Sequence, residues 1–233
     1  MNENESKHRE IADGMLPIQP DFQIKQVKCY NIDCMAFMKT IPDNFYELAI
    51  VDPPYGIEQA KGIEMGKWKR NIHKEKNWDN AIPGEAYFKE LMRISENQVI
   101  WGGNYFLDYL GKTRCFLVWD KKNGTNPMSD CELAWTSFDS SVRKFTYSHI
   151  QDFNKNIKRI HPTQKPIELY KWILNKYSNI NQKIIDTHGG SCSIGCAGMD
   201  DGFDIDICEI DKEYFNDAVN RLKDNVQEYL DFT

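Results

Sequence analysis

Short apolar runs alternate with helix-like patterns along the chain from about residue 21 onward. Apolar runs bounded by turn residues predict buried strands, whereas apolar positions three and four residues apart predict amphipathic helices. The strands predicted in this way are Ile24–Tyr30, Glu47–Val51, Gln98–Trp101, Cys115–Trp119, Glu132–Ser137, Arg143–Tyr147, Lys183–Asp186 and Asp204–Cys208. The predicted helices are Cys34–Thr40, Glu85–Glu96, Tyr105–Leu110, Pro166–Tyr177, Ile194–Asp200 and Lys212–Leu230. This alternation is typical of an α/β sheet.

Residues 132–147 interrupt the alternation, because two strand patterns follow each other there without a helix between them. We expect these two strands to form an antiparallel hairpin on an otherwise parallel sheet. Residues 1–20 are polar and aperiodic, and we interpret them as a mobile tail. Residues 21–233 are interpreted as one domain with a long aperiodic insertion at 57–80, a kind of loop that is usually functional.

The distribution of charge along the chain is more informative than the net charge of the whole chain. The 233 residues include 29 Lys and Arg against 35 Asp and Glu, a net charge of −6, which excludes a basic surface over the whole molecule. Residues 112–165, however, hold ten basic against five acidic residues, and residues 57–80 hold six against four. Residues 200–233 hold three against eleven. We therefore expect basic loops at 57–80, 121–130 and 148–160, and an acidic C-terminal face.

The apolar runs are too short for a membrane span or a signal peptide. The longest unbroken ones, Cys34–Met38 and Cys115–Trp119, have five residues each, whereas a span needs about 20 and a signal peptide core about 7–15. The seven cysteines are scattered and form no CxxC pair. We therefore expect a soluble, cytoplasmic protein with reduced thiols and without a metal site.

The tetrapeptide Asp52-Pro53-Pro54-Tyr55 directly follows a predicted strand, at the place where α/β sheets bind ligands. The two prolines remove two backbone donors, so the segment offers mainly carbonyl and carboxylate acceptors. Tyr55 adds a flat aromatic face. We interpret the segment as a notch for a planar ring with an exocyclic amino group, whose hydrogens would point at Asp52 and the Pro53 carbonyl. A rigid turn is the alternative interpretation.

A second candidate site begins at Asp186, which ends another predicted strand. The turn that follows contains Gly190-Ser191-Cys192-Ser193 and opens a helix, and glycine in such a turn lets a ligand approach the backbone. Cys192 stands where a dinucleotide-binding fingerprint has its second glycine. Glu209 ends the next strand and can accept hydrogen bonds from both ribose hydroxyls of a nucleoside cofactor. A tight turn and a surface glutamate are the alternative interpretation.

The third motif, His161-Pro-Thr-Gln164-Lys165-Pro166, precedes a predicted helix and by itself indicates only a helix start. The order of the motifs is more informative. Asp52-Pro-Pro-Tyr, Ile100-Trp-Gly-Gly-Asn-Tyr, this third motif, the turn after Asp186 and Glu209-x-Asp-x-x-Tyr214 follow one another along the chain. In this order they resemble the amino-group DNA methyltransferases of the β arrangement, in which the catalytic tetrapeptide precedes the cofactor loop. The resemblance spans about residues 24–222.

The resemblance implies a Rossmann-like methyltransferase fold with a seven-stranded, mostly parallel sheet, one antiparallel strand and helices on both faces. It also implies S-adenosylmethionine as cofactor and methyl transfer to the N6 atom of an adenine flipped out of double-stranded DNA. The catalytic residues that it assigns are Asp52, Pro53, Pro54 and Tyr55.

The resemblance assigns a second set of residues to the cofactor: Asp33, Gln164, Lys165, Asp186, Gly190, Ser191, Cys192, Ser193 and Glu209. Asp33 would reach the cofactor adenine and Glu209 the ribose, while the turn after Asp186 would hold the methionine part. The chain departs from the family in that turn. His188 replaces a usual Phe, Cys192 a usual Gly, and Ser193 a usual Thr.

Several alternatives stay open. A cytosine-N4 methyltransferase uses the same chemistry, although Asp52 stands where that class more often has Ser. An RNA or protein-amide methyltransferase shares a proline-proline-aromatic notch, but the His161–Pro166 motif disfavours it. A catalytically impaired DNA-binding homologue would fit the altered cofactor turn. A role in restriction-modification and a homodimer are compatible with the sequence.

Overall fold

The computed structural model describes residues 18–56, 82–124, 129–148 and 159–231. They form a nine-stranded sheet in the order β1-β2-β9-β8-β3-β4-β6-β5-β7. The strands are β1 (Phe22–Ile24), β2 (Val27–Tyr30), β3 (Tyr46–Val51), β4 (Ser95–Trp101), β5 (Phe116–Asp120), β6 (Cys131–Thr136), β7 (Arg143–Thr146), β8 (Lys183–Asp186) and β9 (Asp204–Cys208). The sheet is mostly parallel; β1 and β6 run against their neighbours.

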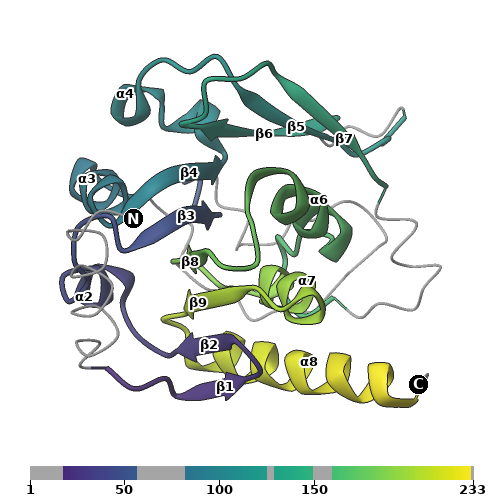
Figure 1. The fold of residues 1–233 in the computed structure, drawn as a ribbon. Helices are drawn as coiled ribbons and strands as arrows, with labels where there is room; N and C mark the ends of the chain where they lie inside the picture. The colour runs from purple at the N-terminus through teal and green to yellow at the C-terminus, as the bar shows by residue number, and fades with distance from the viewer. Residues whose placement is uncertain (1–17, 57–81, 125–128, 149–158, 232–233) are drawn as a thin grey trace.

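Helices cover both faces of this sheet, as expected (Figure 1). The helical elements are α2 (Cys34–Met38), α3 (Glu85–Ile94), the 3-10 turn η2 (Gly103–Tyr105), α4 (Leu107–Leu110), α6 (Ile167–Tyr177), α7 (Ser193–Asp201) and α8 (Lys212–Asp231). On one face, Phe88 and Leu91 of α3 pack with Val51 and Ile100 of the central strands. This face carries α2, α3 and α4.

The opposite face carries α6, α7 and α8. Here Ile173 of α6 and Leu222 of α8 are fully buried in one cluster with Ile50, Ile184 and Ile205 of the sheet. Successive strand residues point to opposite faces, so Ile50 and Val51 serve different cores. Both faces of β3, β8 and β9 are therefore covered. This fits the apolar run of β3, whereas β9 alternates Asp and Ile and buries the Asp206 side chain.

Two sequence predictions about the sheet need correction. The sheet has nine strands rather than seven. The predicted hairpin between residues 132–137 and 143–147 is wrong, because β5 lies between β6 and β7. β6 pairs antiparallel with both β4 and β5, whereas β7 pairs parallel with β5 at the edge of the sheet. The loop between β6 and β7 thus crosses β5 instead of folding back in a tight turn.

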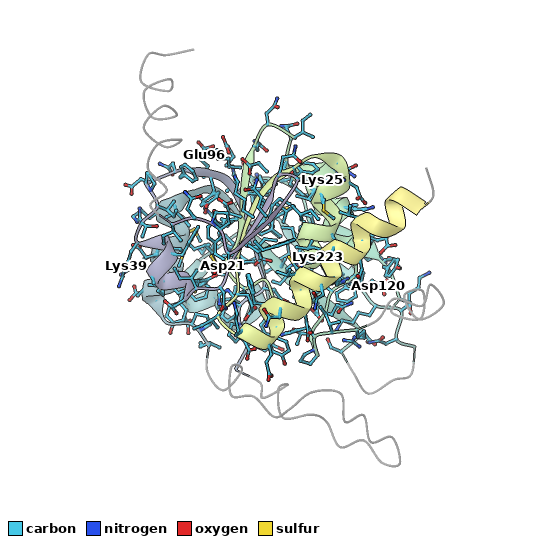
Figure 2. All side chains as sticks on the ribbon, turned by 90° about the horizontal axis from the view of Figure 1, so that it is seen from below. Asp21, Lys25, Lys39, Glu96, Asp120 and Lys223 are labelled. Carbon is cyan, nitrogen blue, oxygen red and sulfur yellow. The ribbon has the colours of Figure 1, made fainter. Side chains whose placement is uncertain are left out.

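The first predicted strand is also divided. Lys25 adopts φ 51, a left-handed conformation that reverses the chain between β1 and β2. β1 then pairs antiparallel with β2, and β2 pairs parallel with β9. Strand β1 contacts α8, which crosses the face seen in Figure 2, where Lys223 lies with its Nζ 5.3 Å from the ring centre of Phe22.

Several predicted segments lie wholly or partly outside the described residues. These are most of the tail at 1–20, the insertion at 57–80, and parts of the loops at 121–130 and 148–160. All seven cysteines are free thiols, as expected. No helix within the described ranges combines the length and apolar character that crossing a bilayer requires.

Candidate active site

The segments that follow β2, β3, β8 and β9 meet at one edge of the sheet, because parallel strands place their carboxyl ends together. They line a cavity of about 270 Å³, to which the segment 161–165 also contributes. Of the residues singled out from the sequence, those that line it are Asp33, Asp52, Pro54, Lys165, Gly190, Ser191, Ser193 and Glu209. The remaining predicted residues, Pro53, Tyr55, Gln164, Asp186 and Cys192, are outside the lining. One cavity thus brings together motifs from both halves of the chain.

The Asp52 carboxylate is held by two donors. The Tyr55 hydroxyl donates to Asp52 Oδ1 at 2.6 Å, and the Lys165 ammonium forms an ion pair with Oδ2. Lys165 Nζ also lies 3.2 Å from the Tyr55 hydroxyl oxygen. The Lys165 side chain is only 3% exposed. The sequence placed Lys165 with the cofactor residues, whereas its charged end faces the catalytic tetrapeptide.

Burial and charge act in opposite directions on this pair. Burial raises the pKa of Asp52, and the Lys165 ammonium partly offsets that rise. Burial alone would lower the pKa of Lys165, but the carboxylates of Asp52 and Glu132 outweigh it and raise that pKa. Lys165 is therefore protonated at neutral pH, and its charge lies directly beside Asp52.

Glu132, on β6, is a second carboxylate partner of Lys165 that sequence reasoning missed. Its Oε2 lies 3.2 Å from Lys165 Nζ, and its Oε1 lies 2.6 Å from Lys121 Nζ. Burial would raise the pKa of Glu132, but Lys165 and Lys121 outweigh this and lower it to about 2. The available signal was an acidic side chain within a strand whose other residues are mostly uncharged.

The Tyr55 ring rests on residues of the Ile100–Tyr105 motif. Tyr105 stacks on it with ring centres 5.2 Å apart and planes at 20°. Gly102, with φ +68, passes directly beneath the ring, and a Cβ atom at this position would overlap the Tyr55 side chain. The glycine is thus required both by its left-handed backbone and by the close approach of the ring.

The turn after β8 is organised by its backbone. Glu209 Oε2 accepts the Gly190 N–H at 2.7 Å, and its Oε1 accepts the Asp211 N–H at 2.8 Å. Asp186 is buried and accepts the His188 N–H at 3.0 Å. Burial raises the pKa of Asp186 to about 7, and this hydrogen bond only partly opposes the rise.

Cys192 occupies a glycine-like position in the same turn. Its φ of 57 and ψ of 34 place it in the left-handed region, where a residue with a Cβ is strained by about 1–2 kcal/mol. Its side chain is buried in the core behind the turn. The predicted replacement of a fingerprint glycine therefore falls at a position where glycine would be unstrained.

The segment 161–166 joins the two halves of the site. The Lys165 side chain reaches Asp52, while its carbonyl accepts the Ser193 hydroxyl at 2.7 Å. Gln164 turns away from the cavity, and its Oε1 accepts the Ile160 N–H at 3.0 Å. The His161 ring packs on Tyr214, with ring centres 4.4 Å apart.

His188 lines the cavity as well, although the sequence marked it only as a departure from the family. Its ring contacts Tyr87 edge to face, with ring centres 5.2 Å apart. The Thr187 hydroxyl is 2.9 Å from His188 Nδ1 and 2.6 Å from the Tyr87 hydroxyl. Burial lowers the pKa of His188 to about 4, so the ring is neutral at physiological pH.

Comparisons with known proteins agree with this geometry. Residues 112–220 match a family model described as DNA methylase, the N6/N4 methylase family. The type II methyltransferase M2.MboI of Moraxella bovis is 22% identical over 91% of this chain and 97% of its own length.

Solved structures share the fold. The M1.HpyAVI–SAM complex superposes with a TM-score of 0.57, at 20% identity, over 84% of this chain and 100% of that one. The cytosine-N4-specific PvuII DNA methyltransferase gives a TM-score of 0.60, at 12% identity, over 92% and 96%. At these identities the structures establish the methyltransferase fold, and the family match covers residues 112–220. Over residues 112–220 the chain is thus similar to the DNA methylase family, and over most of its length it shares the fold of DNA methyltransferases.

Proposed function

We propose that this chain transfers the methyl group of S-adenosylmethionine to the exocyclic N6 of an adenine flipped out of double-stranded DNA. The observation that carries the proposal is the Asp52 carboxylate, which lines the cavity next to the Tyr55 ring system. The likeness to M2.MboI, a type II methyltransferase by name, supports a role in DNA modification within a restriction-modification system.

The cavity fits this cofactor by its donor and charge pattern. Among the described residues, four carboxylates line it, those of Asp33, Asp52, Glu209 and Asp211, against one ammonium, that of Lys165. S-adenosylmethionine carries a sulfonium and an ammonium group, so an acidic cavity suits its positive charge. A carboxylate at the end of β9 also suits ribose hydroxyls. The solved M1.HpyAVI complex supports the same cofactor.

We assign the cofactor side to the residues named from the sequence. Glu209 would hold the ribose, Asp33 the adenine, and the turn from Asp186 to Ser193 the methionine part. Asp33 Oδ1 accepts the Ala36 N–H at 2.9 Å, which fixes its carboxylate at the start of α2. Gln164, Asp186 and Cys192 would act from behind the lining by shaping this turn, because they do not reach the cavity.

The bound cofactor supplies an electrophilic methyl group on its sulfonium. The chain must raise the reactivity of the target nitrogen, whose lone pair is conjugated with the base. Asp52 and the Pro53 carbonyl would accept hydrogen bonds from its two N–H groups, draw the nitrogen out of that conjugation and favour a tetrahedral geometry. The methylated nitrogen would then release one proton to solvent and keep the other hydrogen. Positioning and electrostatics then contribute most of the rate enhancement. No cysteine takes part in this scheme.

Tyr55 would support the flipped base by stacking. A base inside a duplex cannot be reached by the cavity, so it must be extruded, and an aromatic face replaces part of the stacking that it loses. Tyr105 already stacks on Tyr55 and is itself 45% exposed. The two rings form an aromatic platform beside Asp52.

The identity of the methylated base tests the proposal. The protein is incubated with S-adenosylmethionine and double-stranded DNA of mixed sequence, and the DNA is digested to nucleosides for mass spectrometry. We expect N6-methyl-2′-deoxyadenosine from the wild type and none from Asp52→Ala. N4-methyl-2′-deoxycytidine would assign the chain to the cytosine class. Cofactor binding without any product would indicate the impaired homologue. A homodimer stays a prediction that sedimentation can check.

A further inference from the structure

Glu132 is a buried charge that the proposed reaction does not yet use. Its side chain is 23% exposed, and Oε2 is fully buried and receives no hydrogen bond from the described residues. The only cation that this oxygen meets there is Lys165, at 3.2 Å. A buried carboxylate oxygen is costly unless a cation compensates its charge, so Oε2 depends on the Lys165 ammonium.

Lys165 is shared by two carboxylates that arrive from different strands. Asp52 follows β3 and Glu132 lies on β6, and the Lys165 ammonium sits between them. Lys121 neutralises Glu132 from the other side, through Oε1. The four groups form a row of alternating charge, Asp52–Lys165–Glu132–Lys121, with Asp52 at the end that lines the cavity.

The row has a consequence for the acceptor strength of Asp52. An ammonium paired with Asp52 alone would neutralise that carboxylate and weaken it as an acceptor for another group. Glu132 attracts the same ammonium in a low-dielectric interior, where such interactions are strong. The negative charge of Glu132 therefore weakens the ion pair between Lys165 and Asp52. Glu132 is outside the cavity lining, so it acts through Lys165 rather than on a ligand.

We propose that Glu132 is a positioning residue for methyl transfer, which draws the Lys165 ammonium toward β6 and keeps the Asp52 carboxylate available to the target amino group. This inference rests on the proposed function. Substrate binding on the cofactor side does not involve Glu132, so its removal affects the chemical step and leaves cofactor affinity unchanged.

The kinetic test compares Glu132→Gln and Glu132→Asp with wild type. We expect Glu132→Gln to lower kcat on the order of 10- to 100-fold, as small misplacements of catalytic groups do. The dissociation constant of S-adenosylmethionine, measured by calorimetry, stays within about twofold. Glu132→Asp restores part of kcat. A matched control is Asp139→Asn, which removes an exposed carboxylate just beyond the same strand and leaves kcat unchanged. A wild-type kcat in Glu132→Gln would overturn the proposal.

A second measurement does not depend on methyl transfer. Lysine labelled with ¹³C at Cε reports the pKa of Lys165 by NMR, with the resonance assigned through Lys165→Arg. The titratable groups that interact with Lys165 are Asp52, Tyr55, Glu132 and Asp186.

We expect a lower Lys165 pKa in Glu132→Gln, because a carboxylate that favours the ammonium is gone. An unchanged pKa would show that Glu132 does not act through Lys165. A wild type that methylates no DNA, with this shift still present, would refute the proposed function and leave the electrostatic coupling standing.

Discussion

The two halves of the active site are held in different ways. On the catalytic side, side-chain charges fix one another: Asp52, Lys165 and Glu132 form a buried ionic row. On the cofactor side, backbone geometry dominates. Both carboxylate oxygens of Glu209 accept hydrogen bonds from main-chain N–H groups, and Cys192 has a left-handed backbone conformation. The catalytic side should therefore respond to charge and pH, and the cofactor side to shape.

Removing Lys165 should have the largest effect on the catalytic side of the site. Lys165→Met leaves Asp52 and Glu132 without their shared cation, and breaking a buried ion pair costs about 3–5 kcal/mol. Glu132, with its pKa lowered to about 2, contributes stability above its ordinary pKa and loses it as pH falls through about 2. The difference in the free energy of unfolding between variant and wild type is therefore largest above about pH 5 and becomes smaller in acid.

Urea denaturation at pH 8, 5 and 3 measures this difference in the free energy of unfolding. Lys171→Met is the matched control, because its ion pair with Asp200 is 40% exposed on the lysine side and contributes about 1 kcal/mol or less. A difference that does not change with pH would contradict the view that carboxylates left without a cation cause the loss.

Gly102→Ala should disturb the aromatic platform next. The added Cβ overlaps the Tyr55 ring and displaces it from Asp52, so we expect about 100-fold less methyl transfer with cofactor affinity retained. Gly111→Ala separates this contact from backbone strain. Gly111 also has a positive φ, +70, but nothing lies within 4 Å of its added Cβ. Gly111→Ala loses about 1–3 kcal/mol of stability, because φ 70° with ψ −161° is a backbone region that is nearly restricted to glycine. Gly102→Ala loses about 1–2 kcal/mol from its left-handed backbone and more from the overlap with Tyr55, and it alone loses activity. Equal activities would refute the role of ring placement.

Glu209→Gln tests the cofactor side. The amide keeps one acceptor oxygen but loses the charge, and hydrogen bonds to charged groups contribute about 1.5–3 kcal/mol. We expect calorimetry to show roughly 10-fold weaker binding of S-adenosylmethionine, with kcat at saturation little changed. Glu96→Gln, at an exposed position on β4, serves as the control. A kcat loss without a change in affinity would place Glu209 on the catalytic side of the comparison.

The smallest effect concerns Cys192. Cys192→Ala removes a buried thiol while keeping the left-handed strain, so we expect a loss of about 1 kcal/mol in thermal denaturation. Cys192→Gly loses the same thiol but relieves the strain, which is worth about 1–2 kcal/mol. The glycine variant should therefore be the more stable of the two. The reverse order of stability would show that side-chain packing, rather than backbone conformation, determines the stability of this turn.

Local patterns predicted the central strands well, because β3 and β8 contain apolar residues buried on both faces and β9 has isoleucines at alternate positions. The same patterns could not predict which strands pair. The connection from β6 to β7 crosses β5, and this strand order is determined by three-dimensional packing at the edge of the sheet. The single expected strand at 24–30 contains a turn at Lys25, a residue type that rarely takes a positive φ.

The motifs located the site but not its internal contacts. Asp52, Gly190 and Glu209 were found from their places at strand ends, and the structure brings all three to one cavity. Lys165 could not be connected to Asp52 from spacing, since 113 residues separate them. Glu132 belongs to no motif, so its part in the site emerged only from the fold.

The strand order also has a consequence for how the protein is made. β2 and β3 are consecutive in the chain, yet β9 and β8 lie between them in the sheet. A growing chain that has emerged only to residue 180 therefore lacks both central strands, and β2 and β3 have no partner on their facing edges. Such edges are prone to mispairing, and pairing over long sequence separations slows folding. The cavity can form only after residues 183–209 have been synthesised, so nascent chains should depend on chaperones until late in translation.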